Sequence, residues 1–330
     1  EGRNDDYAMG MLDRLNRMLE TSTAMLSALG LPSEIIIVDW NPPLSRAPLA
    51  DAIRETIRRT PGSEVVPIRI VTVPTEVHMQ VPHHKAHALF DLICANVGLR
   101  RARGKWILKT NIDNILSPAV MKFIARQQLE ENTVYRATYL EQWVNGPEVD
   151  ARPPPYDLLD WLFNRDDLLE QANRRLQDVQ ASYPEDQGVC EGLAPSEHAS
   201  RRDHPPYFGF REDDEPRFYG LGSGDFVLAS RELVFRVHGY PQVSQNWQVD
   251  DLIHCRFRAV GAKQVVLHPP CVTVHQNHVR VNRVRSSTRW VVTDRNFHQI
   301  CDAPFNVLPT ESGLEDDWGF PDAPFFEAVI

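Results

Sequence analysis

The stretch that decides the fold spans residues 95–113 and reads ANVGLRRARGKWILKTNID. Apolar residues recur three and four positions apart over residues 89–99, which predicts a helix. Arginines crowd its last turn, and Gly104 follows as the expected C-cap. The apolar run 106–108 predicts a buried strand that delivers an acid, Asp113, at its carboxyl end. A helix that leads into such a strand is typical of a βαβ unit, in which ligands bind beyond the strand ends.

The segments on either side repeat this alternation of helix and strand. We expect helices over residues 7–29, 48–59 and 118–129, and buried strands over residues 35–38, 68–73 and 133–140. Alternating strands and helices predict an α/β fold with a doubly wound, mostly parallel sheet.

Residues 145–217 interrupt the pattern with a proline-rich run, a helix expected over residues 157–176 and a long polar stretch. We interpret this segment as an insertion or lid, because long loops are usually functional or disordered. Regular structure resumes at Phe218. We expect strands over residues 226–229, 264–267 and 271–274, a helix over 232–236, and a helix that leads from the Asp250-Asp251 pair to Val260.

Composition sets outer limits on function. The 330 residues are 42% hydrophobic, which is enough for a sizeable core, and the net charge of -10 argues against nucleic acid as a partner. No apolar run approaches the roughly 20 residues that span a bilayer, and no signal peptide is present. Because the chain starts at Glu1 without methionine, we expect a processed form or a fragment. A cytoplasmic location is favoured, and the Golgi lumen is the alternative if an upstream membrane anchor was removed.

The cysteines suggest neither a zinc site nor a disulfide framework. The five residues are an odd number, are widely scattered and contain no CxxC pair. Cys94 and Cys255 fall within apolar helical patterns, so we expect both to be buried free thiols. The absence of an N-x-S/T sequon weakly favours a protein that is not secreted.

Asn111 and Asp113 point to the same side of an extended strand end, so both side chains could face one ligand. Such oxygen donors suit a hard divalent cation that also takes substrate phosphates. The structural alternative is an Asx turn or a helix N-cap before Ser117-Pro118.

Two further pairs allow both a chemical and a structural interpretation. Asp250 and Asp251 suit the first turn of a helix because of its dipole, but a carboxylate pair also provides a general base. His275 and His278 follow a late strand, where they are either solvated or metal ligands. Imidazole ligands would favour Mn²⁺ over Mg²⁺.

Asp39 ends a buried strand, where it could bind a base or ribose or cap the next turn. Arg3 and Asp5 follow a supposed first strand and occupy the same rim. The glycines of residues 222–224 match neither a Walker loop nor a dinucleotide fingerprint.

Taken in order, these motifs resemble nucleotide-sugar-dependent glycosyltransferases of the GT-A fold. The segment from Asn96 to Asp113 is similar to the family's N-x-G-x-x-x-A-x-G…D-x-D segment. Residues 222–261 are similar to the galactosyltransferase-like stretch, with its G-Y-P turn, a tryptophan, an acid pair and R-x-x-x-x-G. His275-Gln276 is similar to the family's late metal-binding histidine. The three blocks cover roughly half of the chain, and the sugar stays open.

The resemblance implies a role for each matching residue. Asp113, Asn111 and His275 or His278 would hold the divalent cation, Mn²⁺ favoured over Mg²⁺. Arg3, Asp5 and Asp39 would line the nucleoside pocket. Asp250 would be the general base, with Asp251 beside it, and Asp225 and Trp247 would bind the acceptor. The implied activity is transfer of a sugar from a nucleotide diphosphate sugar, UDP-sugar favoured, to a glycan or small-molecule hydroxyl. Inversion is the implied stereochemistry.

Two positions depart from the family pattern. Asn111 replaces an acid, which removes a negative charge from the metal site, and Val249 stands where a glutamate is usual. These departures motivate one alternative function, a non-catalytic carbohydrate-binding scaffold. A nucleotidyltransferase is the other alternative, because such enzymes share the Rossmann-like half and the metal-binding acid. The expected single GT-A domain covers residues 1–330, with a nucleotide-sugar half (1–143), an insertion (144–217), an acceptor and catalytic half (218–285) and an extension (286–330).

Overall fold

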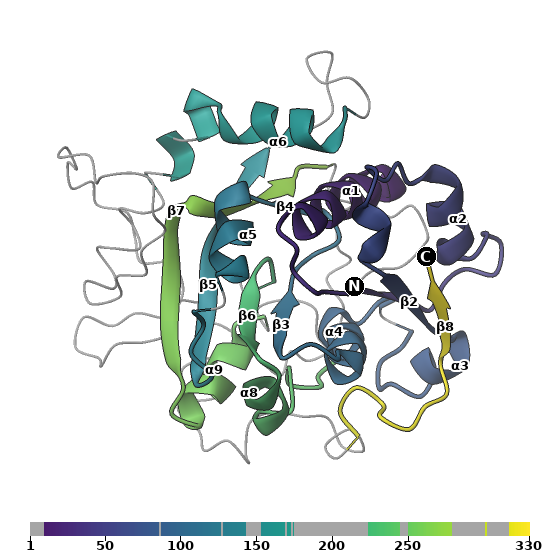
Figure 1. The fold of residues 1–330 in the computed structure, drawn as a ribbon. Coiled ribbons are helices and arrows are strands. Elements are labelled where there is room, and N and C mark those ends of the chain that lie inside the picture. The colour runs from purple at the N-terminus through teal and green to yellow at the C-terminus, as the bar shows by residue number, and fades with distance from the viewer. Residues whose placement is uncertain are drawn as a thin grey trace.

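A computed structural model of the chain describes residues 10–85, 87–126, 128–142, 153–168, 170–172, 174, 224–244, 250–278, 301 and 317–330. Its strands form a three-stranded sheet in the order β1-β2-β8 and a five-stranded sheet in the order β3-β6-β5-β7-β4 (Figure 1). The fold is therefore α/β, as the alternating pattern predicts.

The three-stranded sheet contains the first two predicted strands. β1 (Ile35–Trp40) and β2 (Ile68–Val73) pair in parallel, and β8 (Phe326–Val329) adds to β2 in the antiparallel direction. The runs of Ile and Val in β1 and β2 suit a parallel pair that is largely buried. The two predicted strands are confirmed, whereas no sequence motif indicated β8.

The five-stranded sheet carries the strand ends that position the candidate site. β3 (Trp106–Lys109) pairs antiparallel with β6 (Val227–Ser230), β5 (Thr133–Gln142) pairs parallel with β7 (Lys263–Gln276), and β4 (Asn114–Leu116) pairs antiparallel with the end of β7. The described pairings are thus mixed rather than mostly parallel. β7 is also one strand where two were expected, because a register shift between Ala137 and Thr138 of β5 accommodates Pro269 and Pro270.

The predicted helices are present, most of them with shorter ends. They are α1 (Met11–Ala28), α2 (Leu49–Thr56), α4 (Asp91–Arg101), α5 (Pro118–Ala125), α6 (Pro155–Phe163), α8 (Arg231–Arg236) and α9 (Leu252–Ala259). A further short helix, α3 (Thr75–His78), was not predicted from the sequence. Gly104 is not the C-cap of α4: the helix ends because Ala102 adopts an extended conformation. The helix expected over residues 157–176 is interrupted at Asn164.

The helices cover the sheets and build the core. α1, α5 and α6 bury an apolar cluster against β4, β5 and β7, while α4, α8 and α9 bury a second cluster (Figure 1). α4 contacts both β1 and β3, so one helix joins the two sheets. Among the described residues, no helix combines the length and the apolar character needed to cross a membrane.

The cysteine prediction is half wrong. Cys94 is buried and free, as expected, but Cys255 of α9 forms a disulfide with Cys301. Cys271 is also disulfide-bonded. Partners 46 positions apart meet only through the tertiary fold, so neither their spacing nor the apolar setting of Cys255 could reveal the bond.

Candidate metal centre

The pairing of β4 with β7 places Asp113 beside two histidines. Asn114 pairs with His275 across the two strands, and Asp113 directly precedes Asn114. The carbonyl oxygen of Asp113 accepts hydrogen bonds from the backbone N–H of Gln276 (3.0 Å) and from its side-chain amide (3.2 Å). The backbone of Asp113 is therefore held by Gln276, and the next residue, Asn114, is held by its pairing with His275.

The carboxylate of Asp113 is the centre of this group. Its Oδ2 lies 3.6 Å from Nε2 of His275 and 3.5 Å from Nε2 of His278. The three side chains offer ligand atoms that lie within 4.8 Å of one another, and Asp113 is only 7% exposed. Nε of Arg14, on α1, lies 3.5 Å from the same oxygen. One carboxylate thus faces two imidazoles and a buried guanidinium.

The donor set fits a first-row divalent metal. One carboxylate oxygen and two imidazole nitrogens suit Mn²⁺, Fe²⁺ or Zn²⁺ better than Mg²⁺ or Ca²⁺, which prefer oxygen. In both histidines the nitrogen that faces the Asp113 carboxylate is Nε2. Asp113, His275 and His278 are therefore the residues that would hold a cation here.

A second carboxylate, that of Asp225, is hydrogen-bonded to Asn114, next to the triad of Asp113, His275 and His278. Its Oδ1 accepts hydrogen bonds from the side-chain amides of Asn114 (2.9 Å) and Asn111 (3.2 Å). Burial raises the pKa of Asp225 above its ordinary value, opposed by the hydrogen bond from Asn114 and by the charges of His275 and Lys109. Asn114, which directly follows Asp113, thus connects the Asp225 carboxylate to the segment that carries Asp113.

Lys109 engages the oxygen that Asn111 would offer to a metal. Nζ of Lys109 donates to Oδ1 of Asn111 (3.1 Å) and to the carbonyl oxygen of Gly224. The amide nitrogen of Asn111 points to Asp225. Asn111 therefore connects Lys109 to Asp225 in this structure, and its role as a metal ligand stays a prediction.

Asp250, the predicted base, lies against the same group. A Cβ atom added at Gly224 would be 2.9 Å from Oδ2 of Asp250 and 3.7 Å from the side-chain nitrogen of Asn111. The absence of a side chain at Gly224 thus lets the Asp250 carboxylate approach. Asp251 is the N-cap residue of α9 but makes no side-chain capping hydrogen bond.

Of the remaining candidates, the structure describes Asp39. Asp39 belongs to β1 in the other sheet, where it is 1% exposed and pairs with Thr72. Arg3, Asp5 and Trp247 lie outside the described residues.

The arginine of the R-x-x-x-x-G match has a structural contact. Nη1 of Arg256 donates to the carbonyl oxygens of residues 237, 238 and 239, and so holds the turn after α8. Burial lowers the pKa of Arg256 to about 10.

Sequence reasoning missed Arg14, Lys109 and Asn114. A lysine inside a buried strand, next to the N-x-D motif, is a signal that could have identified Lys109. Asn114 belongs to no motif that the sequence shows, so nothing marked it as part of the site. Arg14 gives no signal, because an arginine on an amphipathic helix is expected to face solvent.

Comparison with known proteins adds no assignment. No protein-family model matches the chain, and no curated protein sequence matches it.

Proposed function

We propose that the protein is a metal-dependent glycosyltransferase of GT-A type, which transfers a sugar from a nucleotide diphosphate sugar, preferably a UDP-sugar, to an acceptor hydroxyl. The observation that carries this proposal is the meeting of three distant motifs. Asp113 from the N-x-D segment lies beside His275 and His278. Asp250 from the acid pair lies against Gly224 and near Asn111.

Asp113, His275 and His278 would hold the cation in this proposal. A bound divalent cation supplies positive charge that stabilises the departing diphosphate. The buried guanidinium of Arg14 balances the charge of Asp113, and the hydrogen bonds from Gln276 keep the Asp113 backbone in place. The chain's own contribution is thus a preformed, mostly buried set of donors.

Asp250 would act as the general base. Its carboxylate takes the proton from the acceptor hydroxyl while that oxygen forms a bond to the anomeric carbon of the donor. The bond between this carbon and the diphosphate oxygen breaks, and the nucleotide diphosphate leaves with the electron pair. Asp225 and Asn111 border this position and would help to orient the acceptor.

A non-catalytic carbohydrate-binding scaffold is the second candidate. The observation that favours it is the hydrogen bond from Lys109 to Asn111, which occupies the oxygen at the place of the motif's first acid. Such a protein would bind a sugar ligand but transfer nothing.

The test measures binding of UDP, GDP and CMP to the whole chain by calorimetry, with and without Mn²⁺. We expect one nucleotide to bind only with the metal and to lose this binding in Asp113→Ala. Asp51→Ala, which removes an exposed acid in α2, is the matched control. Absence of metal-dependent nucleotide binding would overturn the proposal.

Donor hydrolysis and transfer then separate the two candidates. Asp250→Asn should keep metal and nucleotide binding and lose turnover, because the amide accepts no proton. Wild-type chain that binds nucleotide and Mn²⁺ but releases no nucleotide diphosphate from any donor would favour the scaffold.

We further propose that the protein works in an oxidising compartment, which makes the Golgi lumen a better expectation than the cytoplasm. The Cys255–Cys301 disulfide supports this, because disulfides persist outside reducing compartments. Alkylation of free thiols in freshly isolated protein, followed by mass spectrometry, tests it. Labelling of Cys255 and Cys301 without prior reduction would contradict it.

A further inference from the structure

A cavity between α5, α6 and the β5–β7 pair lies apart from the candidate metal centre. Its volume is about 330 Å³, within the range of small-molecule sites. The residues that line it include Lys122, Phe123, Arg126, Leu140, Asn164 and Val272. Ser117 follows Asp113 at the far end of β4, about 13 Å away at the usual rise of a strand. No lining residue belongs to the metal centre.

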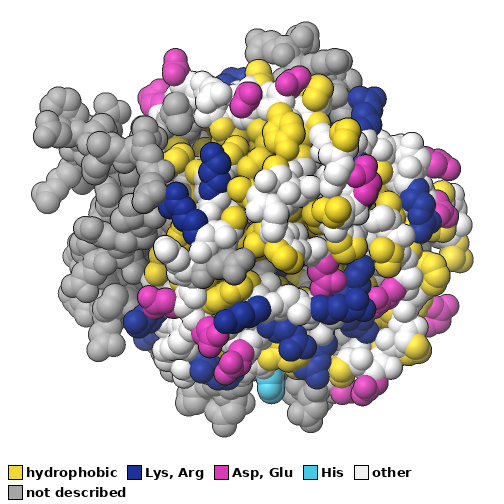
Figure 2. All heavy atoms as spheres, in the orientation of Figure 1, with side chains coloured by type: hydrophobic (Ala, Val, Ile, Leu, Met, Phe, Trp, Pro, Cys, Tyr) yellow, Lys and Arg dark blue, Asp and Glu magenta, His cyan; other side chains and the backbone are white. Residues whose placement is uncertain are grey.

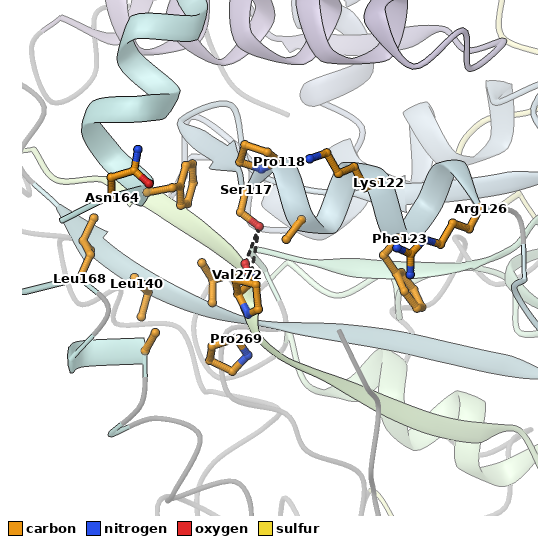
Figure 3. A pocket seen from close by; sticks show the side chains of 14 residues that line it. Ser117, Pro118, Lys122, Phe123, Arg126, Leu140, Asn164, Leu168, Pro269 and Val272 are labelled. Atoms are coloured by element: carbon orange, nitrogen blue, oxygen red, sulfur yellow. Dashed lines mark hydrogen bonds between the residues drawn. The ribbon is translucent and has the colours of Figure 1, made fainter. Parts of the chain in front are cut away.

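The walls of the cavity are largely apolar. Phe123, Leu140, Leu168 and Val272 surround it in Figure 3, and Pro269 closes its lower side. Ser117 contributes no free hydroxyl, because its Oγ donates to the carbonyl oxygen of Pro270 and accepts from two backbone N–H groups. An apolar ligand body would therefore meet matching walls.

The charged side chains described at the rim of the cavity are both positive. Lys122 and Arg126 are one helical turn apart on α5, and both line the cavity (Figure 3). Within the described part of the chain, the lining contains no Asp or Glu. In a protein of net charge -10, a cavity whose described charged lining residues are Lys122 and Arg126 is a local exception. Figure 2 shows hydrophobic side chains gathered over α5 and α6 with Lys and Arg side chains beside them.

Two polar groups of the rim are available to a ligand. Among the described residues, the Lys122 ammonium has no ion-pair partner, and the side-chain amide of Asn164 makes no hydrogen bond. Asn164 lies at the end of α6, across the cavity from α5. A negatively charged head group would thus find a cation on one side and an amide donor on the other.

We propose that this cavity binds an amphipathic anion: an aliphatic chain within the apolar walls and a carboxylate or phosphate head at Lys122 and Asn164. The cations select the sign of the head, because a cationic or neutral head of the same chain would lose the charge-assisted contact. The site is independent of sugar transfer, and its ligand needs no metal.

Calorimetry on the whole chain without metal tests the proposal, with dodecanoate and dodecyl phosphate below their micelle concentrations as probes. We expect one saturable site per chain and at least about tenfold weaker binding of dodecyltrimethylammonium. The tighter of the two anions names the head group. Equal binding of the anionic and cationic probes would overturn the proposal, as would the absence of a saturable site.

Two variants locate the site. Lys122→Gln removes the cation and should weaken dodecanoate binding about fivefold, whereas Lys105→Gln, on another surface, should leave it unchanged. Ala119→Trp fills the cavity from α5 and should abolish binding, with circular dichroism used to confirm that the variant is folded. Retained affinity in Ala119→Trp would show that the anion binds elsewhere and would refute the assignment.

Discussion

Asp113 and Asp39 are acids at the ends of buried strands, but their surroundings differ. β4 is antiparallel to β7, which brings His275 and His278 to Asp113 from the C-terminal half of the chain. β1 is parallel to β2, which places Thr72 beside Asp39. A strand-terminal acid therefore becomes a candidate metal ligand through the strand that pairs beside it. Its own position in the sequence is not sufficient.

The largest expected effect is a loss of folding stability, without a loss of metal binding, when the core next to Asp39 is changed. Trp40 is fully buried next to Asp39, and its indole N–H donates to Nδ1 of His78 (2.9 Å). Trp40→Ala should lower the free energy of unfolding by about 4 kcal/mol, because it removes a large buried ring. Urea denaturation measures this loss. Mn²⁺ affinity of the folded fraction should change less than about twofold, as expected for distant sites.

Trp40→Phe is the control for this comparison, because it keeps an aromatic ring and removes the hydrogen bond to His78. If either Trp40 variant remains folded and loses Mn²⁺ binding, then the end of β1 belongs to the metal centre, and the contrast between the two regions is wrong.

The next largest effect is a direct comparison of the two acids. Asp113→Asn should weaken Mn²⁺ binding about 100-fold or more, because it neutralises the only carboxylate of the described triad. Asp39→Asn should change it less than about twofold. Electron paramagnetic resonance of free Mn²⁺ gives both affinities. Equal losses in the two variants would mean that both acids face one ion.

The pH dependence of folding stability provides a third comparison, between a buried histidine and an exposed one. His254 of α9 is 2% exposed, and burial, with a smaller contribution from Arg136, holds its pKa well below the ordinary 6.5. Below that pH the unfolded chain binds a proton that the folded chain does not. Stability should therefore fall as pH drops below 6.5, by about 1.4 kcal/mol per pH unit from this group.

Chemical denaturation between pH 5 and pH 7 measures this slope in wild type and in His254→Leu. The variant should lose the His254 contribution, while His83→Gln, a change in a surface loop, should keep the wild-type slope. An unchanged slope in His254→Leu would show that His254 is protonated in the folded protein.

The sequence allowed much of the fold and part of the site to be predicted. The periodic apolar runs predicted most helices and strands, and β2 matches the expected residues 68–73. They did not predict that the sheets are mixed, since a run of apolar residues does not state the direction of its neighbour. Asp113 and the two histidines were predicted as candidate metal ligands from their residue types and from the family resemblance, and the β4–β7 register brings them together.

Polar residues buried by the fold could not be predicted. α1 reads as an ordinary amphipathic helix, yet Arg14, Asn16, Arg17 and Glu20 on it are buried. A period of 3.6 distinguishes two faces of a helix but does not show that other segments cover the polar one. Here Asn16 contacts Thr56 at the end of α2, and Arg17 contacts Gln276 at the end of β7.

The smallest predicted effect concerns Arg14 and has the opposite sign to that of Asp113. Its guanidinium lies 3.5 Å from Asp113 Oδ2 and is 2% exposed, so its charge opposes a cation at the same carboxylate. Arg14→Met keeps the apolar packing of α1 and should tighten Mn²⁺ binding about fivefold, a small part of the repulsion expected between such close charges. Arg54→Met is the control, because Arg54 pairs with Asp51 of the same helix, α2. Tighter binding in Arg14→Met alone would show that Arg14 serves as the counter-charge of the metal-free site. Weaker binding would show instead that Arg14 orients Asp113 toward the ion, and the two histidines would then not be sufficient to define the site.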